Sequence, residues 1–117
     1  MAYILLVEDD EQVRLLIEEI LIMSGHCVAV AETVAAGSTL LDAGPSYDLT
    51  ITDDRLPDGN GLTIANCATE HGIKVIIISG FLAEYPADQL LPYITLAKPF
   101  RMSQLTAAIA HVLSTHG

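Results

Sequence analysis

Short apolar runs alternate with amphipathic stretches along the chain. The runs are rich in aliphatic and β-branched residues, which is typical of strands covered on both faces by helices. We predict five such strands, at residues 3–7, 27–31, 49–52, 75–78 and 94–97. A helical or less regular stretch follows each of them, so the pattern is β-α repeated five times.

The predicted helices cover residues 11–24, 33–42, 62–71, 86–91 and 102–113. Thr33 is a suitable N-cap, and Gly25 and Gly72 are suitable stops. Pro86 is tolerated only in a first turn, so we expect the fourth helix to be short or displaced. Helical spacing predicts which residues of the first and last helices face inward: Val13, Leu16, Ile17, Ile20 and Ser24, then Met102, Leu105, Ile109 and Val112.

This alternation implies an α/β fold, a parallel sheet with helices on both faces joined by right-handed crossovers. The candidate architecture is the doubly wound, five-stranded, flavodoxin-like (βα)5 sheet with strand order 2-1-3-4-5. A length of 117 residues, with no repeat or linker, predicts a single domain over residues 1–117. We find no apolar run long enough to span a bilayer and no signal-peptide pattern.

The formal net charge is −10, from 15 acidic and 5 basic side chains. This charge argues against binding of nucleic-acid backbone, which needs clustered Lys and Arg, and is compatible with binding of a cation. Cys27 and Cys67 lie in apolar segments, and we interpret them as buried reduced thiols of a cytosolic protein. The four histidines show no ligand spacing and are interpreted as ordinary polar residues: His26, His71, His111 and His116.

Carboxylates stand where predicted strands end. Glu8 and Asp9 follow the first strand, and Asp53 follows the third. In the 2-1-3-4-5 order these strands are neighbours at the point where the order reverses, so their carboxylates are expected to converge there. Ser79 and Lys98, at the ends of the fourth and fifth strands, are expected beside them.

Such a constellation suits phosphoryl transfer. Three carboxylates in one site repel each other unless a cation neutralises them, and an all-oxygen ligand set favours Mg²⁺ over zinc. Mg²⁺ usually brings a phosphate with it, for which Lys98 supplies a positive charge and Ser79 a hydroxyl donor. The nucleophile would then be a carboxylate, giving an aspartyl phosphate.

The motifs resemble those of the receiver domain of bacterial two-component response regulators, over essentially the whole chain. They are the Glu8-Asp9 pair, DLTITD ending in Asp53, LPDGNG after it, ISG around Ser79, and KPF at Lys98. Each is weak alone, and their occurrence together, in order and at strand ends, is a strong signal.

The resemblance implies a role for each matching residue. Asp53 matches the phosphoacceptor, and Asp9, Asp53 and the backbone carbonyl of Arg55 match direct Mg²⁺ ligands, with Glu8 acting through water. Ser79 matches the hydroxyl residue that binds the phosphoryl group, and Lys98 matches its ion-pairing lysine, before a peptide bond that is commonly cis in the family.

The resemblance also implies a cytoplasmic signalling module rather than an enzyme. It would promote only its own phosphorylation and dephosphorylation. The donor would be a phosphohistidine on a histidine kinase or a histidine phosphotransfer protein. Binding to neither nucleic acid nor membrane is expected of this domain.

Three positions depart from the common family pattern. Asp54 stands where an apolar residue is frequent, and it is a rival acceptor although the strand-end position favours Asp53. The guanidinium of Arg55 could pair with Glu8, Asp54 or the phosphate. Thr95 replaces the usual switching aromatic residue, so a homodimer is allowed but not predicted.

Two alternatives to the phosphoacceptor module remain open on the sequence. One is a Mg²⁺-dependent hydrolase with an aspartyl-phosphate intermediate, which would be expected to carry an acid/base carboxylate at position 55. The other is a degenerate receiver that serves only as an interaction surface. Leu15 and Ile22, on the predicted outer face of the first helix, suggest a surface that docks a helical bundle of the kinase.

Overall fold

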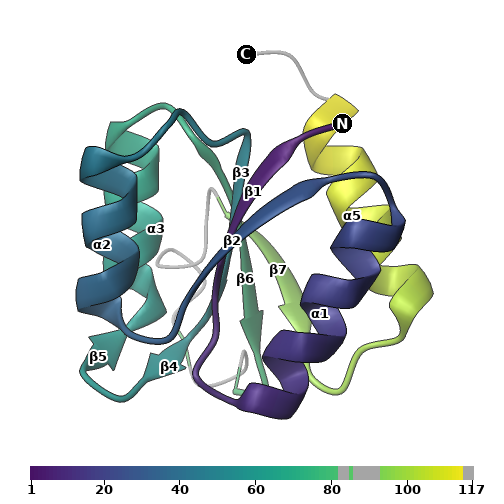
Figure 1. The fold of residues 1–117 in the computed structure, drawn as a ribbon. Helices are drawn as coiled ribbons and strands as arrows, with labels where there is room; N and C mark the ends of the chain where they lie inside the picture. The colour runs from purple at the N-terminus through teal and green to yellow at the C-terminus, as the bar shows by residue number, and fades with distance from the viewer. Residues whose placement is uncertain (82–84, 86–92, 115–117) are drawn as a thin grey trace.

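A five-stranded parallel sheet lies between two layers of helices in the computed structural model, which describes residues 1–81, 85 and 93–114 (Figure 1). Its strand order is β2-β1-β3-β6-β7, and every neighbouring pair is parallel. This confirms the predicted order 2-1-3-4-5, because β4 and β5 lie outside the sheet. The five strands are β1 (Tyr3–Val7), β2 (Cys27–Ala31), β3 (Leu49–Asp53), β6 (Lys74–Ser79) and β7 (Ile94–Ala97).

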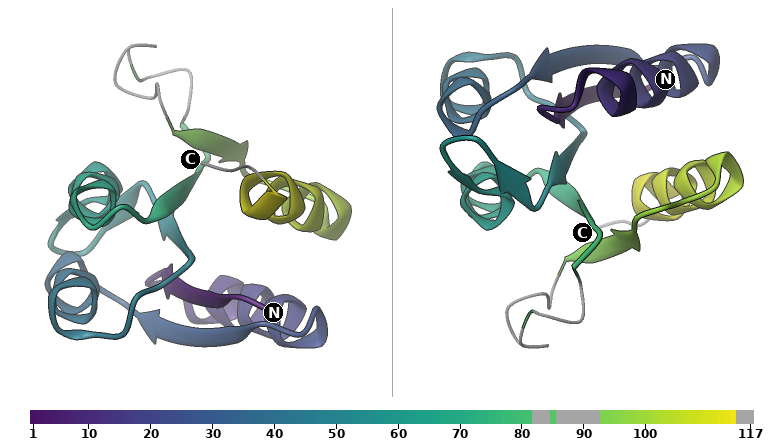
Figure 2. Two further views of the ribbon diagram at one scale, coloured as in Figure 1. Left: turned by 90° about the horizontal axis from the view of Figure 1, so that it is seen from above. Right: turned by 90° about the horizontal axis from the view of Figure 1, so that it is seen from below.

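Among the described residues, two helices cover each face of the sheet (Figures 1 and 2). Helices α1 (Glu11–Met23) and α5 (Met102–Ser114) pack on one face, and α2 (Val34–Ala43) and α3 (Gly61–Glu70) pack on the other. Both faces therefore need apolar residues, which explains the unbroken apolar runs of the strands. The predicted helix at 86–91 lies outside the described residues.

The side chains of β1 show how one strand contributes to the hydrophobic cores on both faces of the sheet. Ile4 and Leu6 belong to the core beneath α1 and α5, whereas Leu5 and Val7 belong to the core beneath α2 and α3. All four are fully buried. Successive residues of a strand point to opposite faces, so a single run of aliphatic residues fills two cores.

Two predicted helix faces need correction. Leu16 and Ser24 of the first helix were expected inside, but both are exposed, and the buried residues are Ile17, Ile20 and Leu21. The apolar stripe on α1 is broad, and packing rotates the buried face toward Leu21. Met102 was also predicted to face inward and is 57 % exposed, because it is the first residue of α5 and lies beyond the core.

The acidic loop after β3 contains an antiparallel pair of two-residue strands, β4 (Arg55–Leu56) and β5 (Gly59–Asn60), that was not predicted. Strands this short leave almost no periodic signal in the sequence. In the turn between them, the Asp58 carboxylate accepts hydrogen bonds from the backbone N–H groups of Val34 and Ala35, at 2.7 and 3.0 Å. These bonds lower the pKa of Asp58 and tie the hairpin to the start of α2.

The cysteines are free, as predicted, but they are not buried. Cys27 is exposed on the edge strand β2, and Cys67 is partly exposed on α3. An apolar segment at the edge of a sheet or on the flank of a helix still has an outer side, which the sequence interpretation overlooked. Within the described residues, none of the helices has the length and apolar character that a membrane span requires.

Candidate functional site

Three carboxylates meet at the carboxyl edge of the sheet, the lower edge in Figure 1. Glu8 and Asp9 follow β1, and Asp53 is the last residue of β3. Each offers a carboxylate oxygen, and these oxygens all lie within 4.8 Å of one another. The predicted convergence of these residues is confirmed, because β1 and β3 are adjacent and end at the same edge.

Lys98 joins this group from the loop after β7. Its Nζ lies 3.0 Å from Oε1 of Glu8 and 3.3 Å from Oδ1 of Asp53. Burial alone would lower the pKa of Lys98, but its hydrogen bonds to both carboxylates and their charges outweigh burial and raise that pKa. Lys98 is therefore a firmly charged ammonium group that bridges two acids. The peptide bond from Lys98 to Pro99 is cis, as the resemblance implied.

Ser79 ends β6 and is fully buried. Its Oγ accepts a hydrogen bond from the backbone N–H of Phe81 at 2.8 Å, and its carbonyl accepts one from the backbone N–H of Lys98 at 2.9 Å. Ser79 is thus next to Lys98 where β6 and β7 end, since Ser79 pairs with Ala97 in the register of these strands. Its expected closeness to the carboxylates stays a prediction. The hydroxyl still has its own proton to donate.

The protonation of Asp53 reflects this crowding. Burial, and then the nearby negative charge of Glu8, raise the pKa of Asp53 to about 7, against the opposing charge of Lys98. The side chain of Glu8 is 2 % exposed and that of Asp53 is 11 % exposed, so water screens their repulsion poorly. The site therefore has more negative charge than Lys98 alone neutralises.

This arrangement fits a hard divalent cation. The candidate ligands are all carboxylate oxygens, without sulfur or imidazole, which is the donor set that Mg²⁺ prefers. Asp9 is exposed, which leaves one side of the cluster open to an ion with bound waters. Glu8, Asp9 and Asp53 are the residues that would hold it.

The residue after Asp53 is held away from the cluster. Asp54 is buried, and its Oδ2 accepts a hydrogen bond from the hydroxyl of Tyr85 at 2.8 Å. The same oxygen lies 3.8 Å from Nε of Arg55, whose guanidinium stacks 3.6 Å from the ring centroid of Phe81. Of the pairings considered for Arg55, the structure thus shows the one with Asp54.

No sequence signal identified Tyr85 or Phe81 as partners of these residues. Tyr85 is 31 positions from Asp54 in the chain, and its role depends on where the loop after β6 lies. Burial, followed by the hydrogen bond to Asp54, raises the pKa of Tyr85, so the phenol stays protonated as the donor. Only the folded structure reveals that Tyr85 donates a hydrogen bond to Asp54, the rival phosphoacceptor.

Gly61, the first residue of α3, lies directly against the site. A Cβ atom here would collide with the carbonyl oxygen of Asp53. The N–H of Gly61 also donates to the carbonyl of Asp54 at 2.8 Å. The second glycine of the LPDGNG motif therefore allows α3 to begin against the backbone that carries Asp53.

Known proteins share this architecture. The response regulator receiver domain family model matches residues 4–110. The receiver protein from Sinorhizobium medicae has a solved structure that is 30 % identical, with a TM-score of 0.91, over 97 % of this chain and 95 % of that one. A receiver domain of the Pseudomonas aeruginosa sensor histidine kinase PA1611, with a magnesium ion in its active site cleft, is 23 % identical with a TM-score of 0.86, over 97 % and 98 % of the two chains.

Relatives among characterised sequences are regulators. The transcriptional regulatory protein CpxR of Klebsiella pneumoniae is 34 % identical over 122 residues, covering 97 % of this chain and 50 % of CpxR. The response regulator receiver protein CpdR of Brucella abortus is 30 % identical, over 97 % of this chain and 98 % of CpdR. The chain spans about half the length of its CpxR relatives. Because the family model matches residues 4–110 and the fold agrees with that of solved receiver structures, the chain belongs to the response regulator receiver domain family.

Proposed function

We propose that residues 1–117 form a phosphoacceptor domain that receives a phosphoryl group on Asp53 from a phosphohistidine of a kinase or phosphotransfer protein. The observation that carries this proposal is the cluster itself. A strand-end carboxylate lies among two further carboxylates and 3.3 Å from a lysine ammonium. This combination of a nucleophile, a candidate cation site and a phosphate-binding charge suits phosphoryl transfer.

In this mechanism a carboxylate oxygen of Asp53 attacks phosphorus while the bond from phosphorus to the donor imidazole nitrogen breaks. The imidazole leaves with the electron pair of that bond. Lys98 Nζ, which contacts both Glu8 and Asp53, would donate to a phosphoryl oxygen. The hydroxyl of Ser79, which accepts from the N–H of Phe81, would donate a hydrogen bond to a second oxygen.

Mg²⁺ held by Glu8, Asp9 and Asp53, with the Arg55 carbonyl, would supply positive charge for the phosphoryl oxygens. Support comes from the oxygen-only ligand set, and from the magnesium ion in the site of the PA1611 receiver domain. Arg55 stands where a hydrolase with this chemistry would be expected to carry a second acid/base carboxylate, so we favour the signalling module over an enzyme. We further propose that the domain acts in the cytoplasm.

The test is intact-protein mass after incubation with acetyl phosphate, with Mg²⁺ or with EDTA. We expect an increase of one phosphate that requires Mg²⁺. A folded protein that binds Mg²⁺ but gains no phosphate from acetyl phosphate or phosphoramidate would support the degenerate receiver instead. Continuous release of inorganic phosphate from acetyl phosphate, at a rate far above that of related receiver domains, would support the hydrolase.

The partner surface is proposed on α1. Four large apolar side chains of this helix are more than half exposed: Leu15, Leu16, Ile22 and Met23. Leu16 also lines a surface hollow with Pro99 and Phe100, next to Lys98. An apolar helix face beside the site would let a helical bundle place its phosphohistidine near Asp53.

Charged substitutions on this face should separate docking from chemistry. We expect Leu15→Glu with Ile22→Glu to slow phosphotransfer from a phosphorylated histidine kinase at least about tenfold, because each charge would be desolvated in the interface. Labelling by acetyl phosphate, which needs no docking surface, should be unchanged. Val30→Glu, at an exposed apolar position on the edge strand β2, is the control. Equal kinase-dependent rates in the double variant and the wild type would refute the proposed surface.

A further inference from the structure

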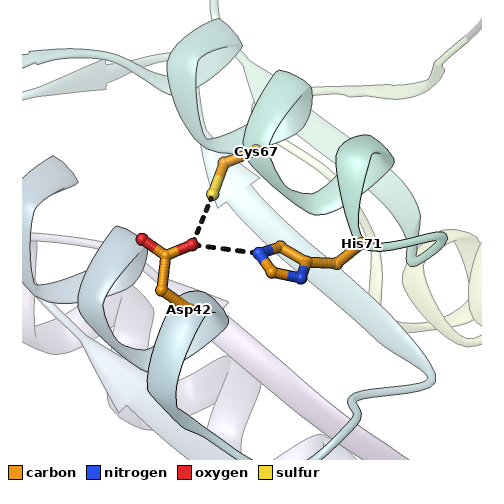
Figure 3. A group of neighbouring side chains, drawn as sticks. All are labelled: Asp42, Cys67 and His71. Carbon is orange, nitrogen blue, oxygen red and sulfur yellow. Dashed lines mark hydrogen bonds and ion pairs between the residues drawn. The ribbon is translucent and has the colours of Figure 1, made fainter.

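A second group of candidate ligands lies at the other end of the helices that cover the sheet. Asp42 is in the last turn of α2, and Cys67 and His71 are in the last turn and at the C-cap of α3 (Figure 3). Their ligand atoms all lie within 4.8 Å of one another. Helices α2 and α3 run away from the carboxyl edge of the sheet, so this group is separate from Asp53 (Figure 1).

The group was missed in the sequence because its members are distant or were interpreted one at a time. Cys67 and His71 are four residues apart, which places both on one face of a helix. Asp42 lies 25 and 29 positions before them and reaches the group through the packing of α2 on α3. The structure therefore brings His71, interpreted as an ordinary polar residue, into a group of candidate ligands that the sequence interpretation did not anticipate.

Both α3 residues point at one oxygen of Asp42 (Figure 3). The Oδ1 atom lies 2.9 Å from Nε2 of His71 and 3.7 Å from Sγ of Cys67. With ordinary zinc bond lengths, a tetrahedral ion would set the nitrogen–oxygen separation at about 3.3 Å and the sulfur–oxygen separation at about 3.6 Å. The sulfur–oxygen separation already matches, and the nitrogen–oxygen separation would need to widen by a few tenths of an ångström, within reach of partly exposed side chains.

The arrangement does not suit nucleophilic catalysis. A catalytic cysteine is typically activated by an imidazole that takes its proton, whereas the thiol of Cys67 and the imidazole of His71 both contact Oδ1 of Asp42. A carboxylate, a thiolate and a neutral imidazole together carry two negative charges, which a divalent ion would neutralise.

We propose that Asp42, Cys67 and His71 bind one Zn²⁺ ion, with water as a fourth ligand, and that this ion clamps the C-terminal end of α2 to that of α3. Sulfur, nitrogen and oxygen in one group favour zinc, in contrast to the oxygen-only site at Asp53. Asp42 is 67 % exposed at its side chain and His71 is 40 % exposed, so the ion has a path from solvent and room for the water. The proposal does not depend on phosphorylation of Asp53.

The test uses the untagged chain with Co²⁺ and Zn²⁺ as probes, in excess Mg²⁺ to occupy the acidic site. We expect one Co²⁺ per chain, with a thiolate-to-cobalt charge-transfer band and the visible absorption of tetrahedral cobalt, both abolished by one equivalent of Zn²⁺. Zn²⁺ should also raise the thermal unfolding midpoint, by roughly 5 °C at saturation, because it binds only the folded arrangement.

Substitutions assign the ligands. Cys67→Ser should lose the charge-transfer band, and Asp42→Asn and His71→Gln should each weaken Zn²⁺ binding about tenfold or more. Cys27→Ser removes the other cysteine and should change nothing. Unfolding midpoints in EDTA check that each variant is folded, which their exposed positions favour. A band that survives Cys67→Ser, a band lost in Cys27→Ser, or Zn²⁺ affinity unchanged by His71→Gln would each overturn the proposal.

Discussion

Asp53→Asn is expected to reduce phosphoryl incorporation from acetyl phosphate more than about 10³-fold, whereas Asp54→Asn should remain within a few-fold of the wild type. The two carboxylates are adjacent in sequence but differ in their surroundings. Asp53 ends β3 among Glu8, Asp9 and Lys98. Asp54 accepts a hydrogen bond from Tyr85, and an asparagine oxygen can still accept that bond. Intact mass and peptide mapping of both variants would measure the difference.

A loss of labelling in Asp53→Asn is informative only if the variant is folded, so its stability must be measured as a control. We also expect this substitution to change the stability in a defined direction. The raised pKa of Asp53 means that its negative charge opposes folding near neutral pH when no cation is bound. Asparagine removes that charge, so at pH 8 without Mg²⁺ the variant should be more stable than the wild type, by roughly 1 kcal/mol after allowance for Lys98 and solvent screening. Phosphoryl incorporation at Asp54 equal to that at Asp53 would contradict the assignment.

The strands and the carboxylate cluster were predictable because both depend on local patterns and one topological rule. Unbroken apolar runs specified buried parallel strands, and the doubly wound order then placed Glu8, Asp9 and Asp53 at one edge. No distance had to be known in advance. The adjacency of β1 and β3 was sufficient.

The features that were not predictable depend on tertiary placement. The orientation of α1 is set by which of several apolar residues meets the sheet, so Leu21 rather than Leu16 is buried. The hydrogen bond from Tyr85 to Asp54 joins residues 31 positions apart across a loop without periodic pattern. The contact of Asp42 with Cys67 and His71 likewise arises only when α2 packs on α3.

The affinity for Mg²⁺ is expected to fall about 100-fold between pH 8 and pH 5, because Mg²⁺ and a proton compete for the Asp53 carboxylate. With the pKa of Asp53 at about 7, nearly all of this carboxylate is ionised at pH 8 and about one part in a hundred at pH 5. An ordinary aspartate would stay ionised over most of this range, and the affinity would barely change. Isothermal titration calorimetry across this range measures the effect, and it suits a chain that has no tryptophan for fluorescence.

The charged neighbours that shift the pKa of Asp53 provide control variants for this prediction. After burial, the charge of Glu8 is the next largest contribution to the raised pKa, and Lys98 opposes both. Glu8→Gln should therefore move the midpoint of the pH dependence to lower pH, while the lost carboxylate weakens binding at pH 8. Lys98→Met should move the midpoint to higher pH, because the positive charge 3.3 Å from Asp53 is gone. A midpoint near pH 4 in the wild type, or the same midpoint in all three proteins, would show that Glu8 and Lys98 do not control the ionisation of Asp53.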